Sequence, residues 1–194
     1  MEHDDARART DEQVAKLVQK GMSEFFGILV ERYETKMLQY GRKFLYNYED
    51  IEDTVQQVFI QAYANIQSFN TSRKFSSWLY RIAHNTFINV IKKKKREPLL
   101  FFDPDIILFH SVKDDRIQKD FYQNEVRQML DQCLDKLSPK YREPLVLYYF
   151  EDKSYKEIAD IMRIPVSTVG IRLKRGRDEM RLLYQTLHGH EYKL

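Results

Sequence analysis

The sequence contains little cysteine, glycine or proline, with one, six and five residues respectively among 194. A single thiol, Cys133, cannot form an internal disulfide, which fits a reducing cytosol. No segment reaches the about 18 apolar residues that a membrane-spanning helix needs, and the opening residues MEHDDARART lack the apolar core of a signal peptide. We therefore expect a cytoplasmic chain without membrane insertion, and the scarcity of glycine and proline favours helices.

The composition is that of a globular protein, since 43% of the residues are hydrophobic and 31% are charged. The length suits one ordinary domain near its upper size or two small domains, and it allows a real hydrophobic core. The formal net charge is only +3. Taken alone, this value argues against a protein that binds polyanions, but binding depends on where the charges lie and not on their sum.

The charges are strongly segregated along the chain. Residues 54–96 contain eight basic residues and no Asp or Glu, which favours a surface that binds a polyanion. Residues 97–125 carry seven acidic residues against three basic ones, which is typical of a linker. Residues 163–181 form a second basic block, with six basic residues against two acidic ones. For either basic block alone, a solvated helix face is an equally good interpretation.

The first half predicts a small all-helical bundle. Apolar residues spaced three or four apart mark one stripe on each of three helices, over residues 26–44, 51–66 and 75–90. The expected stripes consist of Phe26, Leu29, Val30, Tyr33, Met37, Tyr40 and Phe44, then Ile51, Val55, Val58, Phe59, Ala62, Tyr63 and Ile66, then Phe75, Trp78, Leu79, Ile82, Ala83, Thr86 and Val90. These faces are expected to form the core of the bundle.

The second half predicts a helix-turn-helix. Ser138-Pro139 marks a helix start, with a capping hydroxyl before a proline at the first helical position. Ser154 and Glu157 form a capping box that opens a short helix. Ile164-Pro165 ends this helix before Ser167 or its neighbour caps a final basic helix. Two helices joined by a tight turn are the expected result.

The final basic helix is the candidate for binding duplex DNA. In a helix-turn-helix the second helix enters the major groove, where an arginine can bond two acceptors on a guanine edge or hold a phosphate. Packing of the short helix onto Val169 and Leu173 would set the crossing angle. The candidate contacts are Ser167, Thr168, Arg172, Lys174, Arg175 and Arg177. A helical hairpin whose basic face is only solvated is the alternative.

Residues 97–120 are expected to link two domains, which divides the chain into 1–96, 97–120 and 121–194. Two apolar runs, 99–102 and 106–109, interrupt this acidic linker. We expect them to pack against one of the bundles, and a groove for a ligand is the alternative.

Basic and aromatic residues alternate between Ile66 and Asn89. Cations follow phosphates and rings stack on unpaired bases, so this segment is a candidate for binding single-stranded nucleic acid. The apolar stripe assigns Phe75 and Trp78 to the core. Rings that lie off the stripe are better candidates for stacking, although for any single ring a core position is the simpler interpretation. These rings are Phe69, Tyr80 and Phe87.

The residues Ser68-Phe69 and RKFSSWLYRIAHN over 73–85, with the basic tail that follows, resemble region two of bacterial RNA polymerase sigma factors of the extracytoplasmic-function type. DIEDTVQQVF over 50–59 resembles the polymerase-binding stretch of that region, and residues 137–181 resemble region four. The resemblance implies an all-α protein with two helical domains, the second a helix-turn-helix domain. It implies no enzymatic activity, cofactor or metal ion, and a role in directing core RNA polymerase to promoters, for a stress or envelope regulon.

The resemblance also implies a role for each segment. Core polymerase would be bound by Asp50, Glu52, Asp53, Gln56, Gln57 and Phe59. The minus-ten element would be bound and melted by Phe69, Arg73, Lys74, Tyr80, Arg81, His84, Asn85, Lys92, Lys93, Lys94, Lys95 and Arg96. Phe69 and Asn85 would hold a flipped base of the non-template strand, since stacking and base-edge hydrogen bonds can offset the cost of flipping. The helix-turn-helix would bind the minus-thirty-five element as duplex, and an anti-sigma factor would silence the protein.

Two departures from the family pattern stand out. Gln57 occupies a position where the family usually has Glu, and Gly170-Ile171 replaces a commoner basic and polar pair in the recognition helix. Glycine inside a helix costs about 1 kcal/mol relative to alanine and offers no base contact. The minus-thirty-five preference therefore cannot be transferred from the family.

Two other classes of function are weaker. A stand-alone helix-turn-helix regulator would use its first domain to sense or dimerise, but a sensor needs no aromatic and basic loop beside an acidic helix. An enzyme is weakest, because the five histidines show no metal-ligand spacing within a helix and the chain has neither a glycine-rich phosphate loop nor a nucleophile elbow. Cys133 is expected to be a core thiol.

Overall fold

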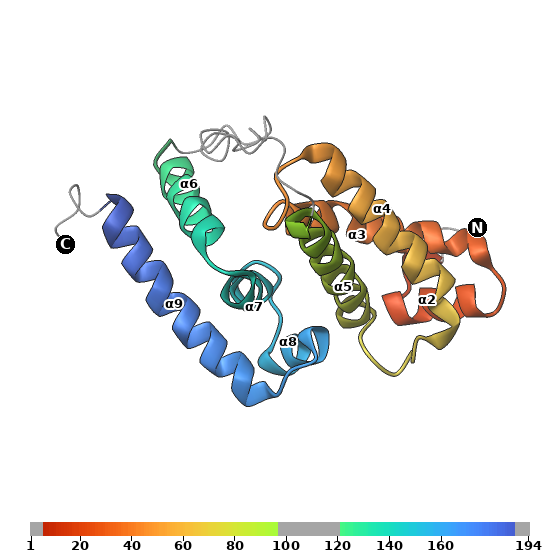
Figure 1. Ribbon diagram of the computed structural model, residues 1–194. Helices are drawn as coiled ribbons and strands as arrows, with labels where there is room; N and C mark the ends of the chain where they lie inside the picture. The colour runs from red at the N-terminus through yellow and green to blue at the C-terminus, as the bar shows by residue number, and fades with distance from the viewer. Residues whose placement is uncertain (1–5, 97–120, 189–194) are drawn as a thin grey trace.

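The computed structural model describes residues 6–96 and 121–188 (Figure 1). The expected linker over residues 97–120, with its two apolar runs, lies outside these ranges, so the proposed domain boundaries stay a prediction. The first range forms α2 (Asp11–Gln19), α3 (Phe26–Gly41), α4 (Tyr48–Ala64) and α5 (Phe75–Arg96), with 3-10 turns at Ser23–Phe25 and Ile66–Ser68. The second range forms α6 (Phe121–Lys136), α7 (Pro139–Tyr149), α8 (Tyr155–Met162) and α9 (Val166–His188).

The helices form two bundles, and all regular structure in the two described ranges is helical. In the first bundle α3 and α5 both pack on α4, and α2 packs on α3; in the second, α6, α7 and α8 all pack on α9. Helix α5 also packs against α8, so it forms the seam between the bundles (Figure 1). The prediction of two all-helical domains, the second a helix-turn-helix, is confirmed. No helix among the described residues has the length and apolar character needed to cross a membrane.

The core of the first bundle lies beneath α5. The buried residues Phe75, Leu79, Ala83 and Phe87 follow one another at four-residue spacing along that helix. The Tyr40 ring from α3 lies 5.8 Å from the Phe87 ring between centroids. Helix α3 approaches so closely here that a Cβ atom on Gly41 would lie 2.7 Å from Cζ of Phe87. The aromatic core therefore requires glycine at this contact.

The apolar stripes predict most of this core, but some stripe residues are less buried than expected. Tyr63 was expected on the buried stripe of α4 but is 46% exposed, and its ring meets Phe26 edge-on at 5.1 Å. Val30 is only partly buried, and Ile28 is buried instead; on α5, Trp78, Ile82 and Val90 are also only partly buried. Tyr63 and Val30 lie at the edge of a stripe, where a shift of one residue changes the face that a side chain occupies.

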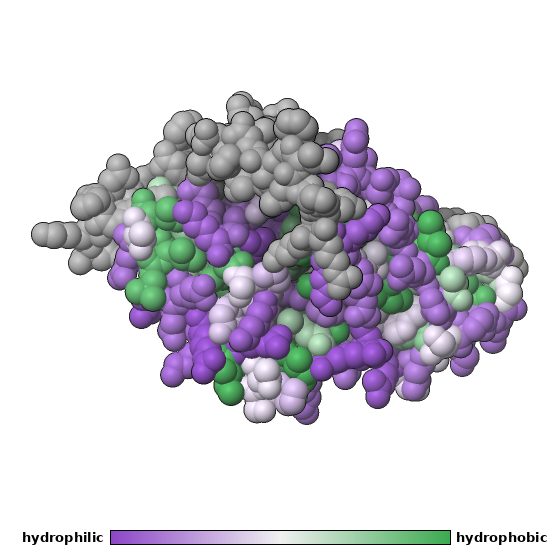
Figure 2. Space-filling view, in the orientation of Figure 1, coloured by the Kyte–Doolittle hydropathy of each residue, from purple (hydrophilic) through white to green (hydrophobic). Residues whose placement is uncertain are grey.

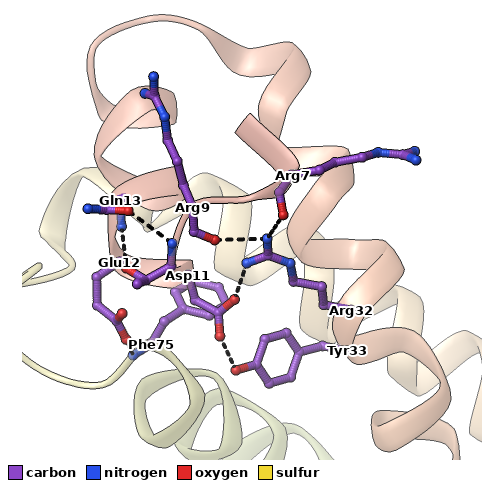
Figure 3. A network of polar contacts seen from close by, with 9 residues as sticks. Arg7, Arg9, Asp11, Glu12, Gln13, Arg32, Tyr33 and Phe75 are labelled. Atoms are coloured by element: carbon purple, nitrogen blue, oxygen red, sulfur yellow. Dashed lines mark hydrogen bonds and ion pairs between the residues drawn. The ribbon is translucent and has the colours of Figure 1, made fainter. Parts of the chain in front are cut away.

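Helix α2 was not among the expected helices, although Thr10 and Gln13 form a reciprocal capping box at its start. An ionic network fastens it to α3 (Figure 3). The Asp11 carboxylate accepts hydrogen bonds from Arg32 Nη1 and from the Tyr33 hydroxyl, both at 2.5 Å. Burial and the Asp11 carboxylate raise the pKa of Tyr33, so this hydroxyl remains a donor at neutral pH.

The helix-turn-helix has the expected capping box, because the backbone N–H of Glu157 donates to Ser154 and the Glu157 carboxylate accepts from the backbone N–H of Ser154. Two details of the helix starts differ from the prediction. Ser138 occupies the cap position of α7, but its side chain makes no capping bond. Helix α9 begins at Val166, so Ser167 lies inside the first turn and does not cap it. Arg163, at a φ of 53°, makes the turn between the two helices.

The two glycines of α9, Gly170 and Gly176, differ in how closely other atoms approach them. A Cβ atom on Gly176 would lie 3.0 Å from Cδ1 of Leu145 and 3.3 Å from the carbonyl oxygen of Tyr141, so the crossing with α7 requires the missing side chain. A Cβ atom on Gly170 would meet only Tyr155, at an ordinary 3.7 Å. The glycine that departs from the family pattern therefore has room for a methyl group.

We expect Gly170→Ala to stabilise the protein by about 1 kcal/mol, because it removes the entropy cost of a helical glycine without a clash. Gly176→Ala is the matched control and should give no gain, since its methyl group must displace Leu145. Chemical denaturation measures both variants. Equal gains would contradict the assignment of the α7–α9 crossing to Gly176.

Candidate nucleic-acid interface

The outer face of α5 is polar and basic. Lys74, Ser77, Arg81 and His84 lie three or four residues apart, on a different face from the buried apolar residues. Asn85 is exposed beside them, and Lys92 and Lys93 are exposed further along the helix. The polarity of this face follows from the core, since the positions not needed to cover α3 and α4 are the ones that carry cations and amides.

Helix α2 holds the loop before α5 at both of its ends. The Gln19 side-chain amide donates to the carbonyl oxygens of Ile66 and Phe69, at 2.7 and 2.8 Å. The Glu12 carboxylate accepts the backbone N–H of Phe75, the first residue of α5, at 2.9 Å (Figure 3). A carboxylate suits this position because the first N–H groups of a helix have no partner inside it. Neither residue was among the predicted site residues.

Three aromatic residues near the basic face lie in the core. Phe69, Tyr80 and Phe87 are 4%, 1% and 2% exposed, so a core position, the simpler interpretation for each ring, is confirmed, and the better suitability for stacking inferred from their place off the stripe is not. Phe69 packs at 5.1 Å from the Trp78 ring, and Trp78, which the stripe had assigned to the core, is only partly buried. The tethered loop turns Phe69 inward, which closes the apolar end of the bundle.

Carboxylates of the second bundle lie against the basic face of α5. Lys74 Nζ is 2.9 Å from Glu157 Oε1, and the Ser77 hydroxyl is 3.5 Å from the same oxygen. Arg81 donates from Nε to the carbonyl oxygen of Asp160 at 2.9 Å, and its Nη2 lies 3.7 Å from the Asp160 carboxylate. Arg73 Nη1 is 3.8 Å from Oδ2, the second oxygen of the Asp160 carboxylate. Both acidic residues belong to α8.

A second set of contacts lies deeper between the bundles. One Glu143 oxygen contacts the Tyr40 hydroxyl at 2.6 Å and His84 Nδ1 at 2.5 Å, and Glu143 is only 2% exposed. The Tyr80 hydroxyl donates to Glu151. Burial and the nearby carboxylate raise the pKa of Tyr40 and of Tyr80, so both hydroxyls are donors. These polar contacts fix α7 and the following turn against the side of α5.

Helix α9, the recognition helix of the helix-turn-helix, presents its polar face outward. Ser167, Lys174, Arg175 and Arg177 are exposed, and Thr168 and Arg172 are partly buried. Ile171 lies among them with 53% of its surface exposed. Ile158 and Ile161 are fully buried with Val169 and Leu173, as predicted for the packing of the two helices. Figure 2 shows polar residues over much of this side of the molecule, with small apolar patches between them.

The outer face of α4 differs from the predicted polymerase-binding set. Asp53, Gln56 and Gln57 are exposed, and Asp50 and Glu52 are partly buried. Phe59 is 8% exposed and belongs to the core, so its expected place on this surface is wrong. Ile60, next to it, is 66% exposed and lies one turn beyond Gln56 and Gln57. Its position just off the buried stripe was the sequence signal that could have identified it.

No group of three or more His, Cys, Asp or Glu residues in the described ranges could hold a metal ion. Cys133 is buried in the second bundle, as predicted, and burial raises the pKa of its thiol.

These features define a two-domain helical protein with one basic face on each domain. Two family models match it: sigma-70 region 2 over residues 29–97, and sigma-70 region 4 over residues 127–180. The chain is 39% identical to the ECF RNA polymerase sigma factor SigW of Bacillus subtilis, covering 86% of this chain and 92% of the relative. It is 33% identical to the ECF RNA polymerase sigma-E factor of Escherichia coli, covering 87% and 91%.

Solved structures show the same fold. CnrH, in complex with the cytosolic domain of CnrY, gives a TM-score of 0.69 at 24% identity, covering 92% of this chain and 99% of that one. The sigma factor RpoE, in complex with the anti-sigma factor NepR from Bartonella quintana, gives a TM-score of 0.66 at 24% identity. The match covers 82% of this chain and 96% of that one.

The chain belongs to the sigma-70 family of RNA polymerase sigma factors, in its extracytoplasmic-function group. It directs promoter recognition and is a DNA-binding initiation factor, not an enzyme. The alternative of a stand-alone regulator is not supported, because both regions of a sigma factor are present and the relatives match over most of their length.

We expect Glu12→Ala to lower the free energy of unfolding by about 1 kcal/mol, because it leaves the first N–H of α5 without its acceptor. Glu34→Ala, at an exposed site on α3, is the matched control and should change stability little. Urea denaturation monitored by circular dichroism measures the difference. Equal midpoints for the two variants would contradict a capping role for Glu12.

Proposed function

We propose that α4 binds core RNA polymerase, α9 binds the minus-thirty-five element as duplex, and α5 binds the melted non-template strand of the minus-ten element, in the cytoplasm. The observation that carries this proposal is the difference between the two basic faces. The face on α9 is a row of exposed basic side chains, Lys174, Arg175 and Arg177, with the exposed Ser167 at the start of the same helix. The face on α5 combines cations with an exposed amide and a supporting layer of rings.

On α5, phosphate contacts are assigned to the long basic side chains. Arg73 and Lys74 are 67% and 72% exposed, and Lys92 and Lys93 extend the charge along the helix. Asn85 carries both a donor and an acceptor and is exposed between them, which suits it to bind the edge of a flipped base. The buried Phe69 ring supports the loop in this role, and it is not proposed as a stacking surface.

On α9, Arg175 and Arg177 can bond guanine edges or phosphates, and the Ser167 hydroxyl can bond phosphates. Ile171 adds an apolar side chain to the same exposed face. An apolar side chain in the major groove contacts the methyl group of thymine. The departure from the family pattern at this position therefore supports a different base preference in the minus-thirty-five element.

On α4, the exposed apolar side chain of Ile60 lies beside Gln56 and Gln57, with Asp53 one turn before them. An apolar centre with a polar surround is the usual composition of a protein-binding surface. Anti-sigma factors are a further class of partner that we propose, because one of the structural relatives, the sigma factor RpoE, is in complex with the anti-sigma factor NepR. The regulon is proposed to be one of envelope or general stress.

The test of this proposal is run-off transcription with the full chain and core polymerase. We expect specific transcripts from promoters whose start sites are mapped after overexpression in cells. Asn85→Ala should reduce the transcript and permanganate-reactive thymines in the minus-ten element while leaving polymerase binding intact. Transcripts that require another sigma factor would refute the function, and equal loss of polymerase binding would refute the role of Asn85.

Ile60→Ala should weaken binding to core polymerase several-fold, because interface-centre apolar residues cost about 1–2 kcal/mol when truncated. Leu182→Ala is the matched control, since Leu182 is 63% exposed on α9, away from the α4 surface. Competition with a labelled sigma factor for core polymerase measures both affinities. An effect of the same size in both variants would remove Ile60 from the proposed surface.

A further inference from the structure

The first cations of the basic face of α5 are already paired with carboxylates of the chain itself. The three cations at the start of this face, Arg73, Lys74 and Arg81, all meet the two acidic side chains that α8 presents, Glu157 and Asp160. We propose that these carboxylates take the place of DNA phosphates, so that the helix-turn-helix domain competes with the promoter strand for α5. This inference rests on the proposed function of α5 as the strand-binding helix.

The geometry of the α8 carboxylates supports competition with phosphates for the cations of α5. Glu157 is held in place by its own capping box with Ser154, which leaves its other oxygen for Lys74 at 2.9 Å. Burial alone would raise the pKa of Glu157, but hydrogen bonds from Ser154 and Lys74 lower it to about 2, so it is charged at neutral pH. A lysine amine or a guanidinium group binds a carboxylate oxygen and a phosphate oxygen in the same way.

The contact is also polar and partly exposed to solvent. Arg73, Lys74 and Asp160 are each more than half exposed, so salt screens their pairs. Polar contacts of this kind are typical of domain interfaces that open and close. Deeper in the interface, His84 and Tyr80 are bound to Glu143 and Glu151, which removes two further candidate DNA contacts from use.

The two DNA-binding faces are affected unequally. Ser167, Lys174 and Arg175 of the recognition helix are exposed in the same structure in which Arg73, Lys74 and Arg81 are paired with carboxylates of α8. The closed chain can therefore present its duplex-binding helix, whereas a melted strand must displace the α8 carboxylates to bind along α5. A partner that separates the bundles raises the fraction of competent molecules, and the apparent affinity for single-stranded DNA rises with that fraction.

The test is the double variant Glu157→Gln/Asp160→Asn in the full chain. Glutamine preserves the capping box, so the fold of α8 is retained. The probe is a labelled single-stranded oligonucleotide that carries the non-template minus-ten strand of a promoter that the holoenzyme transcribes. We expect the double variant to bind it about threefold to tenfold more tightly than the native chain at low salt, with the gap narrowing as salt rises. Asp160→Asn alone should give a smaller gain in affinity for the oligonucleotide.

The matched control is Glu24→Gln/Glu34→Gln, which removes two exposed acidic charges on the first bundle, away from α8. It should leave the affinity close to that of the native chain. Equal affinities of the native chain and the α8 variant would overturn the inference, as would an equal gain in the control or on duplex DNA of random sequence. Because the holoenzyme must already transcribe the promoter, these outcomes leave the proposed function intact, whereas failure of transcription itself would refute that function.

Discussion

The packing of aromatic rings beneath α5 is the constraint on which the rest of the structure depends. Phe75 and Phe87 lie in the core formed with α3 and α4, and this burial fixes the rotation of the helix. Once the rotation is fixed, Lys74, Arg81 and Asn85 must point away from that core. The same hydrophobic contact that stabilises the first domain therefore determines which polar groups are available to bind DNA, or to be covered by the second domain.

Periodicity predicted α3, α4 and α5, and capping signals predicted the helix-turn-helix, because both depend on local rules. The Ser154–Glu157 capping box involves residues three apart, and its structure follows from their types alone. Phe69 and Tyr63 show where such rules fail, since Phe69 lies in a loop and Tyr63 lies at a stripe edge. The exposure of each ring depends on which distant segment lies against it, and Gln19, for example, holds the loop of Phe69 through a hydrogen bond to the Phe69 carbonyl oxygen. The roles of individual side chains on DNA and polymerase stay predictions.

The contacts between the domains had no sequence signal. Lys74 and Glu157 are 83 residues apart, and His84 and Glu143 are 59 apart, so no local pattern pairs them. Charge blocks identified the cations of α5, but the opposing carboxylates are scattered through α7, α8 and the turn between them, a stretch that does not stand out as acidic. The weak net charge of +3 thus hides two complementary surfaces that meet within one molecule.

Helix α2 holds the loop before α5 through Glu12 and Gln19, and this matters when the protein is divided into fragments. The family model for region 2 begins at residue 29, yet the residues that tether the loop before α5, Glu12 and Gln19, lie before it. A fragment cut at the family boundary would keep every residue that resembles a DNA contact and lose the scaffold that positions the loop. The amino-terminal helix is therefore part of the DNA-binding unit in structural terms, although it carries none of the residues by which that unit is identified.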